Sequence, residues 1–246
     1  MTPDRSAILN GLLKAARDES YLVRSAAVRA LGKLKERDAV PELLVALRDG
    51  AGFVADFAIA ALSEMPGEWV GELMLERIAD EDDNVRRAAV MVLGAVGYQA
   101  ALPGLINALN DPVAVVQQFA AEALGKLQDA AAVPALLQAL ERATADGDWA
   151  LAINTAQALS KIGAAEASPA IIALFRRRWD VVAATNSTPP VRKNAVEALA
   201  RLGAGAMPYL LEALRDPELK VRHGAIEALG QMIAQDTAPT DNASAV

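Results

Sequence analysis

The sequence has no cysteine, a single histidine and only 4% aromatic residues, and these shortages exclude several kinds of site. Without cysteine there is no disulfide framework, no thiolate metal site and no cysteine nucleophile. His223 has no second histidine or cysteine with which to share a metal ion, so we expect neither a metal site nor a cofactor. Carboxylates are numerous, but no pair is placed to give an apolar pocket for acid–base work, so we predict no catalytic residues.

The 24 basic residues are outnumbered by 31 acidic residues, and long hydrophobic runs are absent. The net charge is −7, which argues against non-specific binding to nucleic acid or to anionic lipid. The polar N-terminus has no apolar core of a signal peptide, and no apolar run approaches the roughly 20 residues of a membrane span. We therefore expect a cytoplasmic protein whose partner is another protein, not a nucleic acid or a membrane.

The chain does contain one pattern that occurs seven times. Each copy starts at an aliphatic residue, namely Val23, Val54, Val85, Val116, Leu151, Val191 or Val221. Eight residues later there is always a leucine, at Leu31, Leu62, Leu93, Leu124, Leu159, Leu199 and Leu229. The residue after that leucine is always small, as at Gly32, Gly94 and Gly230. Self-similarity at a fixed period predicts an array of supersecondary units.

Each repeat reads as two helices, and each pattern start lies in the second of them. The first helices are marked by apolar residues at helical spacing and cover residues 6–17, 40–47, 69–78, 102–109, 133–140, 169–175 and 207–214. The recurring proline is tolerated near a helix start, and the turn aspartates are expected to cap the second helices. Repeats five and six carry extra residues between their two helices. We predict an all-α solenoid over residues 1–234 and a disordered tail over 235–246.

The turns and helix starts resemble HEAT repeats. Asp18 with Val23-Arg24, Asp80 with Val85-Arg86 and Asp216 with Val221-Arg222 match the aspartate–arginine ladder of that family. The ladder is incomplete, because the arginine position holds Ala55, Gln117 and Ala152, while Arg192 lacks the acid. The short period resembles in particular the HEAT-like repeats of the phycobiliprotein (PBS) lyase family. The resemblance covers about residues 5–234 and implies a superhelix whose second helices line a concave surface.

That concave surface is the predicted binding site. Positions two, six and nine residues after each start lie opposite the core face of the helix. The small residue at the ninth position is expected to leave the groove floor open. The predicted groove residues are Phe53, Asp56, Phe57, Arg87, Met91, Gln118, Phe119, Glu122, Trp149, Ile153 and Gln157. The alternative for Phe57 and Phe119 is that they fill gaps between repeats.

A basic cluster is the secondary candidate. Arg176, Arg177, Arg178 and Trp179 end a first helix and precede an insertion, where they could grip an anionic partner. The alternative is that the positive charges complement the helix dipole. The acidic run at residues 80–83 lacks the glycine and terminal glutamate of a calcium loop, so we interpret it as a turn followed by a helix cap.

Two functions of different classes remain open. The first is a non-catalytic scaffold that binds a protein partner on its concave face. The second follows from the resemblance alone and is a phycobilin lyase-type protein that handles the chromophore of a bilin-bearing partner. A consensus-like array is a third possibility, which the broken ladder and the two insertions argue against.

Overall fold

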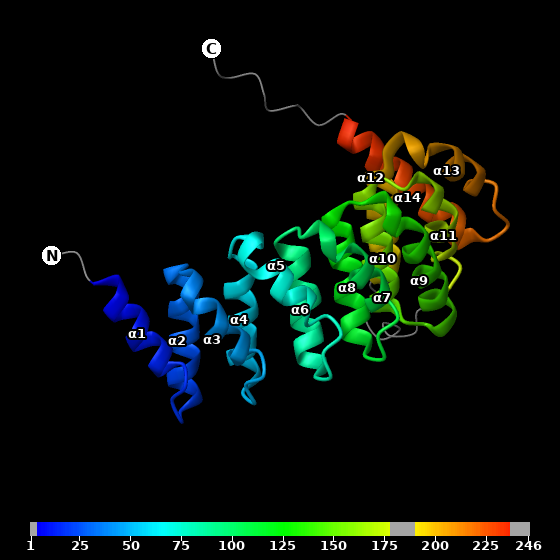
Figure 1. Cartoon of the computed structure of the whole chain (residues 1–246). Helices are drawn as coiled ribbons and strands as arrows, with labels where there is room; N and C mark the ends of the chain where they lie inside the picture. The colour runs from blue at the N-terminus through cyan, green and yellow to red at the C-terminus, as the bar shows by residue number, and fades with distance from the viewer. Residues whose placement is uncertain (1–3, 178–189, 237–246) are drawn as a thin grey trace, which may run out of the picture. The chain divides into compact units, whose positions relative to one another are not determined.

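The regular structure is entirely helical. A computed structural model describes residues 4–177 and 190–236, and these residues form no β-strand. Helices follow one another in pairs, as Figure 1 shows, which confirms an all-α fold of two-helix repeats. The chain divides into two compact units, Met1–Leu127 and Gln128–Val246.

The first unit holds four helix pairs. Its helices are α1 (Arg5–Ala15), α2 (Tyr21–Leu34), α3 (Val40–Ala46), α4 (Gly52–Ser63), α5 (Gly67–Leu75), α6 (Asp83–Ala95), α7 (Leu102–Ala108) and α8 (Ala114–Leu127). The second helices form one layer, in which α2 contacts α4, α4 contacts α6 and α6 contacts α8. Each of them also packs on the first helix of its own pair.

The second unit repeats this arrangement over three pairs. Its helices are α9 (Val133–Asp146), α10 (Trp149–Ile162), α11 (Ser168–Ala173), α12 (Pro190–Leu202), α13 (Met207–Ala213) and α14 (Leu219–Asp236). Here α10 contacts α12, and α12 contacts α14. The end of α14 includes Gln235 and Asp236, which the sequence placed in the tail, and residues 237–246 lie outside the described part of the chain.

The repeat pattern sets the core. The start residue of every repeat except the first is at most 1% exposed, and the leucine eight residues later is fully buried in every repeat except the last. The residue four positions after the start is also buried throughout, including the polar Thr155. One stripe of each second helix therefore faces the first helices, as its 3.6-residue period requires.

Prolines mark the starts of five first helices. They occupy the second residue of α3, α7, α9, α11 and α13, at Pro41, Pro103, Pro134, Pro169 and Pro208. A proline there costs no hydrogen bond, because the first N–H groups of a helix have no partner within it. A short 3-10 turn precedes each of these helices and leads the chain into it.

Candidate functional site

A small hollow lies on the layer of second helices in the first unit. Its volume is about 270 Å³, and its walls come from α4, α6 and α8. It is lined by Ser63, Met91, Ala95, Phe119, Glu122, Ala123 and Lys126. Three of the predicted groove residues, Met91, Phe119 and Glu122, are thus brought together by helices α6 and α8.

The chemistry of this hollow is apolar with a charged edge. The Met91 thioether and the Phe119 ring are both half-buried, so each keeps a surface open to an incoming group. Glu122 and Lys126 are one helical turn apart on α8 and form an ion pair of 2.8 Å. A methionine beside an aromatic ring offers an adaptable apolar contact, while the ion pair can orient a polar group.

Gly32 and Gly94, which follow the regularly spaced leucines of repeats one and three, lie between second helices, so they do not leave the groove floor open as predicted. Ser63, at the same position of repeat two, does line the hollow. Gly94 is buried against α8, where an added Cβ would lie 2.5 Å from the Cβ of Ala123. Gly32 meets Ala61 of α4 in the same way, at 2.6 Å. Second helices stand side by side in one layer, so their flanks are buried as well as their inner face, and small residues let them approach.

Other predicted groove residues of the first unit contact the neighbouring helix instead of the hollow. The guanidinium of Arg29 lies over the ring of Phe57, 5.4 Å from its centre. The Phe53 ring meets the Tyr21 ring edge-on at 5.1 Å, and it stays 44% exposed. These contacts favour the alternative for Phe57 and show that it bridges repeats.

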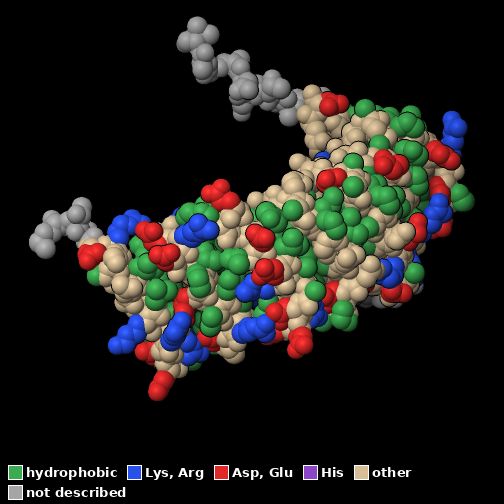
Figure 2. Space-filling view, viewed as in Figure 1, with side chains coloured by type: hydrophobic (Ala, Val, Ile, Leu, Met, Phe, Trp, Pro, Cys, Tyr) green, Lys and Arg blue, Asp and Glu red, His purple; other side chains and the backbone are tan. Residues whose placement is uncertain are grey.

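Polar groove residues beside the hollow include one ion pair. Arg87 of α6 reaches Asp56 of α4 at 3.3 Å, so these two predicted residues are joined across adjacent helices. Gln118 is half-buried on α8, one position before Phe119. Figure 2 shows acidic and basic side chains interspersed on the visible face, so neither sign of charge dominates it.

The remaining predicted groove residues belong to the second unit and lie on α10. Trp149 is the first residue of that helix and is 40% exposed, while Ile153 is half-buried one turn later. The side-chain amide of Gln157 donates a hydrogen bond to the Oδ1 atom of Asn194 on α12. The prediction that these three residues bind a partner stays a prediction.

Two residues of the basic cluster, Arg176 and Arg177, are described by the structure, and both bind groups within the second unit. The guanidinium of Arg176 pairs with the carboxylate of Asp216 and, at 3.5 Å, with that of Glu218. Arg177 donates a hydrogen bond of 2.7 Å to the backbone carbonyl of Ala145. Arg178 and Trp179 lie outside the described residues.

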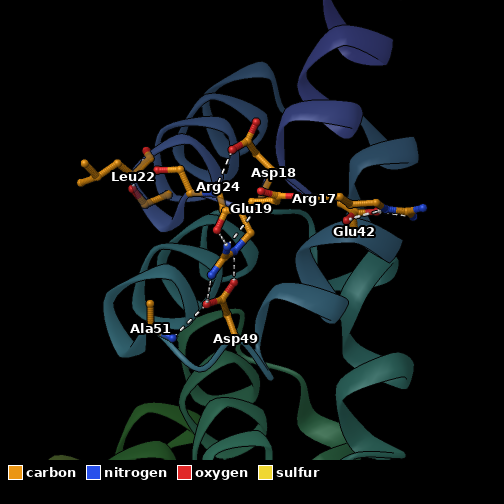
Figure 3. A network of polar contacts seen from close by, with 10 residues as sticks. Arg17, Asp18, Glu19, Leu22, Arg24, Glu42, Asp49 and Ala51 are labelled. Atoms are coloured by element: carbon orange, nitrogen blue, oxygen red, sulfur yellow. Dashed lines mark hydrogen bonds and ion pairs between the residues drawn. The ribbon is translucent and has the colours of Figure 1, made fainter.

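A polar ladder runs along the turns of the first unit, as Figure 3 shows around Arg24. The Nη1 atom of Arg24 donates to the backbone carbonyls of Asp18 and Glu19 in its own turn, both at 2.9 Å. Its Nε and Nη2 atoms donate to the carboxylate of Asp49, in the turn of the next repeat. Arg86 binds Asp111 with the same arrangement. The carboxylate of each rung therefore comes from the following repeat, not from the repeat of the arginine.

Another arginine takes over where the second helix lacks one. The ladder position of α4 is Ala55, and Arg48, in the turn just after α3, pairs with Asp80 at 2.6 Å instead. Arg176 follows Pro169 at the same distance in sequence as Arg48 follows Pro41, and it reaches the turn carboxylate Asp216. Arg176 does so although the ladder position of α12 holds Arg192, which pairs with Glu227 at 3.0 Å instead. The two arginines therefore occupy equivalent places after a first helix, but only Arg48 belongs to a repeat without a ladder arginine.

The turn carboxylates are held in their charged form. The Arg24 hydrogen bond, helped by the Ala51 N–H, keeps the pKa of Asp49 below its usual range against the opposing effect of burial. The N–H of Asp82 and then the Arg48 guanidinium lower the pKa of Asp80. Burial alone would raise the pKa of Asp111, but the hydrogen bonds from Arg86 and from the backbone N–H of Val113 outweigh it.

We expected the turn aspartates to cap the second helices, but these five bind N–H groups within their own turns. Asp18, Asp49, Asp80, Asp111 and Asp216 each accept a hydrogen bond from the backbone N–H two residues later, which orders the turn. Side-chain caps of second helices come instead from Asp82 on α6 and Asp148 on α10. The interpretation of residues 80–83 as a turn followed by a cap is confirmed.

The sequence reasoning missed four residues of the hollow. Ser63, Ala95, Ala123 and Lys126 lie in the last turns of α4, α6 and α8, seven to ten positions after the repeat start. The prediction named binding residues only up to the sixth position after each start, and it treated the small residue at the ninth position as an open groove floor. The ninth position would have pointed to Ser63, had it been read as a wall residue.

Comparison with known proteins identifies the family of this chain and two relatives. The HEAT repeat family matches residues 9–78, 71–146 and 181–240. The phycocyanobilin lyase subunit alpha of Nostoc sp. is 37% identical over 84 residues, which are 34% of this chain and 30% of that protein. The protein of the same name from Pseudanabaena tenuis is 32% identical over 160 residues, 61% of this chain and 59% of that protein.

Solved structures agree on the fold. A Kap121p mutant is similar over 92% of this chain and 29% of its own, with a TM-score of 0.64 and 16% identity. The matched part of the chain spans 30% and 59% of the length of these two curated relatives. Within the described residues, no helix combines the length and hydropathy needed to cross a membrane.

Proposed function

Because this chain belongs to the HEAT repeat family, we propose that it is a non-catalytic interaction module that holds a protein partner on the second-helix layer of its first unit. The observation that carries the proposal is the hollow in which Met91 and Phe119 meet. Repeat arrays bind partners along such surfaces, and an apolar pocket with a charged rim is typical of an interface centre. The hollow is large enough for one side chain of the partner.

The test is a quantitative capture from lysate with two matched baits. Met91→Glu places a charge in the hollow, while Val45→Glu makes a similar apolar-to-acidic change at a 62% exposed position of α3. We expect a partner to be captured by the wild type and by Val45→Glu, and to be lost with Met91→Glu. A photo-crosslinking residue at Ala95, which lines the hollow, should then form an adduct with that partner. Equal capture by all three baits would place the site elsewhere.

The second candidate function is chromophore handling on a bilin-bearing partner, as in a phycobilin lyase. What supports it is the similarity to two proteins named phycocyanobilin lyase subunit alpha. The chain has no cysteine, so the thiol that receives the bilin would belong to the partner. Phycocyanobilin absorbance should shift on titration with the wild type and with Val45→Glu, and less with Met91→Glu. An unchanged spectrum in all cases would leave only the scaffold function.

A further inference from the structure

The two ends of the array leave positions uncovered that every internal repeat buries. The residue five positions after the repeat start is at most 8% exposed in six repeats, at Val28, Ile59, Val90, Ala121, Ala156 and Val196. Its counterpart in the last repeat, Ile226 of α14, is 58% exposed. In a repeat array an apolar face of this kind is normally covered by a neighbouring repeat. The exposed isoleucine therefore marks a face that fits a further second helix.

Gly230 on the same helix is also left open. Its counterparts Gly32 and Gly94 each touch an alanine of the next second helix, Ala61 and Ala123. An added Cβ at Gly230 meets no atom within 4 Å. The space that the next helix fills beside the internal glycines is therefore free beside Gly230.

Arg222 on α14 is the third position of the last repeat that lacks the partner found in internal repeats. Its Nη1 atom donates to the carbonyls of Asp216 and Pro217, at 2.7 and 2.8 Å, as Arg24 does in its own turn. Arg24 and Arg86 also bind the carboxylate of the following repeat. Among residues 4–177 and 190–236, no carboxylate forms an ion pair with Arg222. Its Nε–Nη2 edge is thus available for an acid on a further repeat.

At the other end of the array, residues of the first repeat are exposed although their counterparts in later repeats are buried. Val23 is 40% exposed, whereas the other six start residues are at most 1% exposed. Ala30 is half-buried, although the equivalent Ala61 and Ala123 are buried against the preceding glycines. Asp18 is exposed and occupies the repeat position at which Asp49 and Asp111 form ion pairs with an arginine of the preceding repeat. Among the described residues, no arginine forms an ion pair with Asp18.

We propose that this chain associates head to tail with a second copy of itself, α14 of one molecule packing on α2 of the next. In that register Arg222 pairs with Asp18, Gly230 receives Ala30, and Ile226 and Val23 are buried together. The first two contacts repeat ones that the chain already makes internally, between Arg24 and Asp49 and between Gly94 and Ala123. The surface differs from the hollow around Met91, so this inference stands apart from the proposed function.

The contact is heterologous, since it joins two different patches. Such a contact builds an open series or closes into a ring, so the mass of the wild type should rise with concentration. Raised salt should weaken the Arg222–Asp18 pair without abolishing the apolar contact.

The experiment is sedimentation velocity on the full chain over a range of concentrations, with variants that block one end each. Gly230→Leu places a side chain in the open space on α14, where an added Cβ meets no atom within 4 Å, and Val23→Glu charges the exposed position on α2. We expect the wild type to grow in mass and either variant alone to remain monomeric, with an affinity weaker by about 10-fold or more, which corresponds to about 1.4 kcal/mol. Gly52→Leu, at another glycine with open space, should behave as the wild type.

Mixing the two blocked variants tests the polarity of the contact. Gly230→Leu keeps its α2 end and Val23→Glu keeps its α14 end, so together they should form a discrete one-to-one dimer that grows no further. Wild-type protein that remains monomeric throughout, association of Gly230→Leu equal to that of the wild type, or no dimer in the mixture would each overturn the proposal. Circular dichroism confirms that the variants are folded.

Discussion

Arg24 and Asp49 form a two-point ion pair that joins the second helix of one repeat to the turn of the next, with Nε to Oδ2 at 2.6 Å and Nη2 to Oδ1 at 2.9 Å. Both side chains are largely shielded, at 22% and 10% exposure. Since the same arginine also binds two carbonyls of its own turn, it connects two turns through one planar group.

Replacement of Arg24 by alanine should destabilise the chain. The substitution leaves a shielded carboxylate and two carbonyls without their donor, which costs about 1 to 3 kcal/mol. Chemical denaturation measures the loss. Arg37→Ala is the control, because Arg37 is exposed and forms no ion pair among the described residues, and its effect should stay within about 0.5 kcal/mol. Equal losses for both variants would show that the ladder contributes no stability.

The contribution of Asp49 should depend on pH. Its pKa is lower in the folded chain than in the unfolded chain, where an aspartate titrates near about 3.9. Its stabilising effect is therefore fully present above that value and is lost as the pH falls through the lower folded pKa. Wild type and Asp49→Asn should differ in melting temperature at pH 7 and converge in strong acid. A constant difference across that range would contradict the ion pair as its source.

Leu93→Ala should remove part of the core of the first unit. Leu93 is fully buried, and truncation of such a leucine costs about 2 to 5 kcal/mol through lost burial and the cavity left behind. Leu22→Ala, at a 63% exposed position on α2, should leave melting nearly unchanged. If Leu93→Ala melts like the wild type, the repeat register is wrong.

Gly94→Ala and Gly230→Ala should change stability in opposite directions, although both occupy the same position of the repeat. In Gly94→Ala the new Cβ would lie 2.5 Å from the Cβ of Ala123, so α6 and α8 must separate, at about 1 to 3 kcal/mol. Gly230 has free space, and alanine there should stabilise the helix by up to about 1 kcal/mol. Thermal melts at low protein concentration compare them. A Gly94→Ala variant as stable as the wild type would show that the helices can part without cost.

The sequence predicted the core better than the surface. A repeat period fixes which residues face the first helices, so the burial of Leu93 and its counterparts followed from spacing alone. The side contacts between second helices did not, because Gly94 faces a helix that belongs to another repeat and not its own partner. The same limit applies to Arg48, because its partner Asp80 also belongs to the next repeat.

The candidate site was predicted in part for a similar reason. Met91, Phe119 and Glu122 were named from their place on the open side of each helix, and they do meet. The contacts of Phe57 and Phe53 with Arg29 and Tyr21 depend on how far one helix is displaced along the next, which periodicity does not specify.

The pairing of each ladder arginine with an acid of the next repeat bears on how such a chain can lengthen by gene duplication. Arg24 and Asp49 are 25 residues apart, and so are Arg86 and Asp111. Duplication of one whole period gives every copied arginine an aspartate at the same distance downstream, wherever the copied segment begins. Duplication of a single helix would separate donor from acceptor. The ladder therefore makes the whole period, and not the helix, the smallest segment that recombination can add or remove without repair elsewhere.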